Sequence, residues 1–151
     1  MDTNDVVDTL NDLIETCKDG EYGFRTSAEY MRSADTRQQF ERRAEECRMA
    51  AAELQSLVVQ IGGTAEDSGT VAGAAHRGWV AVKGTLAGYT DKAILEETER
   101  GEDTALERYR AALDKNLPPQ VQAVVQRQYE GVKRNHAQVR TLRDQSRLAS
   151  A

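Results

Sequence analysis

Residues 4–32 read NDVVDTLNDLIETCKDGEYGFRTSAEYMR, and the spacing of the apolar side chains in this stretch predicts one long amphipathic helix. Apolar or small residues recur at alternating steps of three and four, which places them on a single helix face, here called the seam. One acidic residue, Glu21, interrupts this face. The seam positions are Val7, Leu10, Ile14, Cys17, Glu21, Phe24, Ala28 and Met31.

The next stretch repeats this pattern and predicts a second helix after a short turn at Arg32 to Ala34. Asp35 is expected to cap its start, with Gln38 three residues later, and Gly62-Gly63 ends it. A turn this short makes the two helices an antiparallel hairpin. The second seam consists of Phe40, Ala44, Cys47, Ala51, Leu54, Val58 and Ile61.

Two further helices are predicted after residue 90, separated by the Pro118-Pro119 corner. The first opens at Thr90 or Asp91, and proline is tolerated in the first turn of the second. Polar residues 146–151 are expected to form a frayed tail. The two seams are Leu95, Glu99, Glu102, Leu106, Tyr109 and Leu113, and then Val121, Val125, Gln128, Val132, Asn135, Val139 and Leu142.

The intervening residues 69–88 differ in composition, because seven of the eleven glycines fall between Gly62 and Gly88. We expect a weak helix here that crosses between the two hairpins and makes the helix after residue 90 parallel to the second helix. The predicted fold is therefore all-α. It is a four-helix bundle of two antiparallel hairpins joined by a short crossover helix, with residues 1–145 as a single domain.

Charge and hydropathy exclude several classes of function. The chain has 151 residues and a formal net charge of −5, so it lacks the basic surface expected of a general nucleic-acid binder. No apolar stretch reaches the roughly 18 residues needed to span a bilayer, and the N-terminus has no signal-like segment. We expect a cytoplasmic protein that binds neither nucleic acid nor membrane.

Carboxylates on the seams are the main functional signal, since an unpaired buried carboxylate is costly. Counting residues from the shared ends of the helices puts one carboxylate from each of three helices and an imidazole from the fourth at one height. The candidate metal ligands are Glu21, Glu46, Glu99, Glu102 and His136. Such a layer holds two iron or manganese ions in helical bundles, but the Glu-x-x-His pairs of a full di-metal centre are absent.

Lys133 provides a structural alternative for the same residues. A lysine at nearly the height of Glu102 would neutralise the carboxylates in an ion network without any metal. The side chains could equally reach solvent at a loose seam. We therefore expect no cofactor, with iron or manganese as the alternative.

Two other groups of residues have weaker functional interpretations. His76, Arg77 and Trp79 could form a ligand or partner site on the crossover, although anchoring of that helix by the tryptophan is favoured. Cys17 and Cys47 lie within about one helical turn of each other in the first hairpin. We expect a reduced pair in the core, with a disulfide as the alternative.

A resemblance to a known family rests on short stretches spread along most of the chain. They are Leu10–Glu15, Asp19–Phe24, Ala28-Glu29, Ala52–Leu54, His76–Trp79, Ile94–Glu97, Glu99–Asp103, Leu117-Pro118 and His136. In these stretches the chain resembles a family of uncharacterised bacterial ferritin-like four-helix-bundle proteins that are associated with stress responses. This resemblance implies a ferritin-like fold and a link to iron binding or oxidation. With the ligand pairs missing, we expect a non-catalytic bundle that forms a homodimer or binds a partner protein.

Overall fold

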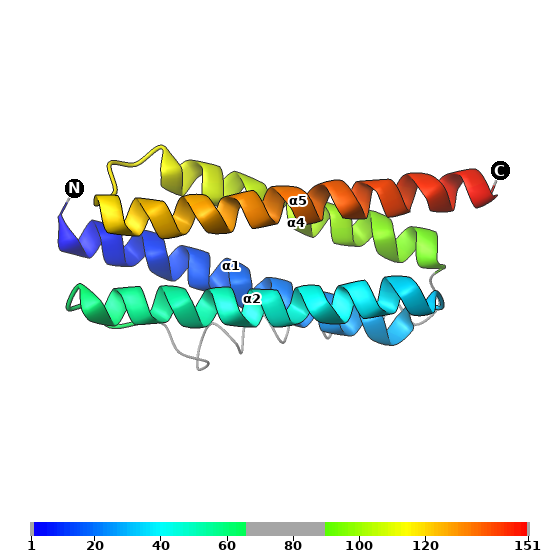
Figure 1. Cartoon of the computed structure of the whole chain (residues 1–151), viewed down its shortest axis with the longest axis horizontal. Helices are drawn as coiled ribbons and strands as arrows, with labels where there is room; N and C mark the ends of the chain where they lie inside the picture. Colours follow the sequence, from blue (N-terminus) through cyan, green and yellow to red (C-terminus); the bar gives the residue numbers. More distant parts are fainter. Residues whose placement is uncertain (1, 66–89, 151) are drawn as a thin grey trace.

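The computed structural model describes residues 2–65 and 90–150, and these residues form four long α-helices without any strand (Figure 1). This confirms the all-α prediction. The predicted crossover at residues 69–88 lies outside the described residues. The helices are α1 (Thr3–Tyr30), α2 (Ala34–Gln60), α4 (Asp91–Leu113) and α5 (Pro119–Ser150).

Each helix packs against two antiparallel neighbours. The pairs α1–α2 and α4–α5 are consecutive in the chain, while α1 also packs against α4 and α5 against α2. The starts of α2 and α4 lie together, because the carboxylate of Asp91 accepts hydrogen bonds from the backbone N–H groups of Arg32 and Ser33. The helices α2 and α4 therefore run in the same direction (Figure 1), as the sequence predicts.

The helix ends follow from local side-chain chemistry. Ser33, not Asp35, caps α2, because the Ser33 hydroxyl accepts a hydrogen bond from the Thr36 N–H. Thr90 caps α4 in the same way, as expected. After α2 the chain turns at Gly62, whose φ of 87° suits a residue without Cβ.

The last helix extends beyond the predicted boundary. α5 begins at Pro119 as expected, but it continues to Ser150, past Ser146, where the tail was expected to begin. Residues 139–148 contain neither glycine nor proline and include several good helix formers, so local propensity favours continuation of the helix.

The core is built from the seams. Tyr109 and Phe40 are among its largest fully buried side chains, and two clusters of buried residues fill the space between the helices. The buried hydrophobic seam positions are Leu10, Ile14, Cys17, Phe24, Ala28 and Met31 in the first stretch, Phe40, Ala44, Cys47, Ala51, Leu54 and Val58 in the second, and Leu95, Tyr109, Val121, Val125, Val132 and Val139 after residue 90.

A chain of polar groups crosses this core and touches all four helices. The Tyr109 hydroxyl donates to Oε1 of Gln128 at 2.8 Å and contacts the Cys17 thiol at 3.2 Å. Because the Tyr109 hydroxyl hydrogen points to Gln128, the hydroxyl oxygen accepts a hydrogen bond from the Cys17 thiol. The Gln128 amide donates in turn to Glu53 at 2.8 Å and to the Ala50 carbonyl at 3.3 Å. Buried polar groups are thus paired across the bundle.

Candidate metal site between α4 and α5

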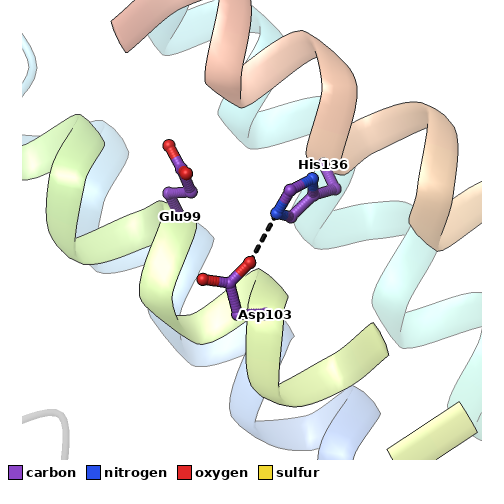
Figure 2. Close-up of side chains that lie close together, drawn as sticks. All are labelled: Glu99, Asp103 and His136. Carbon is purple, nitrogen blue, oxygen red and sulfur yellow. Dashed lines mark hydrogen bonds and ion pairs between the residues drawn. The ribbon is translucent and has the colours of Figure 1, made fainter. Parts of the chain in front are cut away.

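Three side chains that commonly bind metal ions meet between α4 and α5 (Figure 2). Glu99 and Asp103 come from α4 and His136 from α5, and one ligand atom of each lies within 4.8 Å of the other two. Nε2 of His136 is 2.6 Å from Oδ1 of Asp103. Among residues 2–65 and 90–150, this is the one cluster of three or more such ligands.

Helix geometry accounts for the convergence. Glu99 and Asp103 are four residues apart and therefore share one face of α4, and the antiparallel α5 brings His136 opposite them. The side chains of Glu99 and His136 are only 10% and 12% exposed, whereas that of Asp103 is 59% exposed. A shallow pocket of about 200 Å³ beside Glu99 and Asp103 gives solvent access to the cluster.

Arg143 neutralises the buried member of the cluster. Its NH1 lies 2.6 Å from Oε1 and 2.5 Å from Oε2 of Glu99. Its NH2 is 2.9 Å from Oδ1 of Asp144, and the bond to Asp144, with the ion pair to Glu99, raises the pKa of Arg143. A metal ion could use Glu99 as a ligand once this guanidinium moved away.

Glu102 lies deeper than the cluster and apart from it. It is 4% exposed, and its Oε2 has no hydrogen-bond partner among the described residues. Burial raises the pKa of Glu102 above its usual range, although Arg43 and Asn135 act to lower it. Arg43 is itself 9% exposed, and its Nε has no partner within the same described residues. Arg43 and Glu102 are therefore buried residues of opposite charge that do not form a direct ion pair.

The other predicted ligands lie elsewhere. Glu21 forms an ion pair with Arg25 one turn further along α1. Glu46 is exposed near the middle of α2. The structure therefore brings together Glu99 and His136 from the predicted set, but it does not bring Glu21, Glu46 or Glu102 into the same cluster.

Lys133 does not contact the seam carboxylates. Its ammonium lies 3.0 Å from Oε2 of Glu130 and 4.7 Å from the centre of the Tyr129 ring, on the exposed side of α5. A lysine three residues after a glutamate on the same helix is within easy reach of it. Among the described residues, the arginines beside the buried carboxylates are Arg143 at Glu99 and Arg43 at Glu102.

Asp103 and Arg143 were not among the predicted site residues. Asp103 is the last residue of an acidic run, residues 95–103 in the first half of α4, and such a charge-dense stretch usually forms a solvated helix face. Its position four residues after Glu99 could nevertheless have identified it. Arg143 follows the seam residue Leu142, and its long side chain reaches back over apolar surface to Glu99. His76, Arg77 and Trp79 lie outside the described residues.

The two thiols are buried and not bridged. Burial raises the pKa of Cys17 from 9.0 to about 11 and that of Cys47 from 9.0 to about 12. Neither thiol has the lowered pKa that marks a reactive cysteine.

The donor set determines which metal chemistry the cluster suits. One imidazole and two carboxylates are suitable ligands for a single Mn²⁺, Fe²⁺ or Zn²⁺ ion. A di-metal centre needs further carboxylates to bridge two ions, and the part of the chain that the structure describes offers no such group at this position. The residues therefore fit one ion and do not fit two.

Comparisons with known proteins identify a family but no activity. No described helix is long and apolar enough to cross a membrane. A search of functionally curated proteins found no match. A family described as a domain of unknown function (DUF2383) matches residues 5–115, which span α1, α2 and α4 and end before the start of α5. Because this match covers more than half of the chain, the protein belongs to the DUF2383 family.

Proposed function

We propose that this protein binds a single divalent transition-metal ion between α4 and α5 and is a metal-binding protein rather than a di-metal oxidase. The observation that carries this proposal is the convergence of Glu99, Asp103 and His136. A carboxylate–imidazole set of this kind suits manganese, iron(II) or zinc.

The surroundings of the cluster support reversible binding. Asp103 is on the solvent side, so an ion can enter without opening the core, and water would complete its coordination. Arg143 already contacts Asp144, which lies outside the cluster, and could keep this partner after leaving Glu99. The metal would then replace the guanidinium as the counter-charge of the buried Glu99 carboxylate.

The helix arrangement supports a ferritin-like fold for this binding protein. Because α2 and α4 run in the same direction, the chain between Gln60 and Asp91 has to connect opposite ends of the bundle. One long connection between two antiparallel hairpins is the ferritin-like pattern. Fold alone does not establish activity, so the metal proposal depends on the ligands and not on this likeness.

Metal binding can be tested directly on the purified full-length chain. After removal of metals with a chelator, the protein is dialysed against Mn²⁺, Zn²⁺ or, without oxygen, Fe²⁺, and bound metal is measured by elemental analysis. We expect saturation near one ion per chain for at least one of these metals. An iron(II) oxidation assay should show no rate above buffer.

Variants identify the ligands. Asp103→Asn and His136→Gln should each weaken binding by at least tenfold, which corresponds to about 1.4 kcal/mol. Glu97→Gln is the matched control, because this carboxylate is also on α4 but pairs with Arg100. Circular dichroism verifies folding. A wild-type protein that binds none of the three metals would refute the proposal, as would equal losses in the Glu97 control.

The ion pair between Arg143 and Glu99 favours a second candidate, a bundle whose polar layer has a structural role only. In that case Arg143 is the permanent counter-charge, and the protein acts through its surface, as a homodimer or with a protein partner. This candidate predicts no saturable metal binding and a large loss of stability in Arg143→Gln, because Glu99 would then be buried without a counter-charge.

A further inference from the structure

A cleft between α2 and α5 lies apart from the candidate metal site. The pair α2–α5 is the least closely packed of the four neighbouring helix pairs, and the opening between these two helices has a volume of about 490 Å³. This volume falls in the range of pockets that hold small organic molecules. Apolar and thiol groups, including Cys17, Cys47, Ala105 and Val132, line much of its interior.

Two buried charged residues in this cleft each have one polar atom without a hydrogen-bond partner among the described residues. Arg43 and Glu102 both line it, both are more than nine-tenths buried, and neither Nε of Arg43 nor Oε2 of Glu102 has a hydrogen-bond partner among the described residues. No ion pair within 4 Å joins them, although both are described. An unpartnered donor and an unpartnered acceptor in one cleft are costly unless something bridges them.

The remaining interior polar groups of the cleft are already paired. Tyr109 and Gln128 use their hydrogen bonds in the chain that crosses the core. At the rim, Arg127 pairs with Glu53. Arg43 and Glu102 are therefore the buried lining groups that remain to recognise a bound molecule, whereas Glu46 and Arg134 are exposed.

The charge balance of the cleft selects against a charged ligand. Its lining contains three arginines and three glutamates, so its formal charge is zero. A charged molecule would add an uncompensated charge at low dielectric, whereas a neutral molecule would not. A primary carboxamide is neutral and carries an acceptor and a donor side by side. Its oxygen can accept from Nε of Arg43 while its NH₂ group donates to Oε2 of Glu102.

We propose that the cleft between α2 and α5 binds a small neutral molecule with a carboxamide head, held between Arg43 and Glu102, and a short apolar body. The apolar body lies against the thiols of Cys17 and Cys47 and against Val132. This site shares no lining residue with the candidate metal site.

The test compares hexanamide with hexanoate, which has the same shape and a negative charge. Both are titrated at pH 7 into the isotopically labelled full-length protein with a chelator present, and backbone resonances are followed by NMR. Hexanamide should give saturable shifts at Ala105, Gly131 and Val132, and hexanoate should bind at least tenfold more weakly. Two outcomes would overturn the proposal: no saturable shift with hexanamide, which means that water alone fills the cleft, or equal binding of hexanoate.

Two arginine variants locate the head group. Arg43→Lys keeps the charge but removes the Nε donor, and it should weaken hexanamide binding at least tenfold. Arg48→Lys is the matched change on α2 outside the cleft, where Arg48 pairs with Glu45, and it should alter binding less than twofold. If Arg43→Lys fails to fold, the comparison of hexanamide with hexanoate on the wild-type protein still tests the proposal. The chelator keeps the metal ligands empty throughout the titration, so failure of the metal proposal leaves this test intact.

Discussion

The hydroxyl of Tyr109 donates a 2.8 Å hydrogen bond to Gln128 in the centre of the bundle, and it also contacts the thiol of Cys17. This single side chain thus joins three helices by polar contacts inside an otherwise apolar layer. The bonds are directional, so they favour one register of α4 against α1 and α5, which apolar contacts alone specify less strictly.

Replacing Tyr109 by phenylalanine should lower the free energy of unfolding by about 1–3 kcal/mol. The ring would still fill the core, but Oε1 of Gln128 and the Cys17 thiol would lose their buried partner. Urea unfolding monitored by circular dichroism measures the change. Tyr30→Phe is the control, because Tyr30 is only half-buried and no hydrogen bond to its hydroxyl is found in the described part of the chain. Equal losses in both variants would contradict this account.

Most of the fold could be predicted from the sequence because the seams are regular. For example, Phe24, Ala28 and Met31 follow the three-and-four spacing of the first seam, and all three are buried in the structure. The pairing of helices follows from the short turn before α2 and the Pro118-Pro119 corner. The cap of α2 was predicted two residues too late, since Ser33 and Asp35 are both good caps and only the backbone path decides between them.

The site was harder to predict than the fold. Counting residues from the helix ends predicts how far along the bundle Glu99 and His136 lie. It does not predict the direction in which a side chain points. Glu21 is near that level, yet it turns toward Arg25 on its own helix. Arg143 is seven residues after His136, and only the length of its side chain brings it to Glu99. Side-chain reach and rotamer choice depend on packing, which periodicity does not encode.

Arg143→Gln should have opposite effects on the metal-free and the metal-bound protein. Without metal, removal of the guanidinium leaves the buried Glu99 carboxylate without a counter-charge, so the free energy of unfolding should fall. With metal, a competitor for Glu99 is gone, so affinity should rise by roughly tenfold. Thermal unfolding with and without Mn²⁺ measures both effects. Weaker metal binding in this variant would show that Arg143 supports the site rather than competing for it.

Two glycines in helices should respond differently to alanine. At Gly101 an added Cβ would have nothing within 4 Å, so Gly101→Ala should stabilise the protein by about 0.5–1 kcal/mol through helix propensity. At Gly20 a Cβ would lie 2.9 Å from Sγ of Cys47, so Gly20→Ala should be less stable than Gly101→Ala by about 1–3 kcal/mol. Adding Cys47→Ala should recover part of this loss, and chemical denaturation of the four variants, including the Cys47→Ala single variant, gives the coupling. Additive losses in the double variant would rule out the proposed contact.

The buried thiols should make the protein less stable at alkaline pH. In the unfolded chain they ionise near pH 9.0, whereas in the folded protein the pKa of Cys17 is about 11 and that of Cys47 about 12. Their contribution to stability is therefore complete below pH 9 and is lost as the pH rises through the folded values, because the unfolded state releases protons first. Between pH 8 and pH 10 nearly all of the loss falls in the single unit above pH 9, where each thiol costs about 1.4 kcal/mol, so the two together should cost roughly 3 kcal/mol. Urea unfolding at both pH values should show a steeper loss for the wild type than for Cys17→Ala/Cys47→Ala, which keeps every other titrating group. Identical pH dependences in the two proteins would mean that the thiols are accessible to water in the folded state.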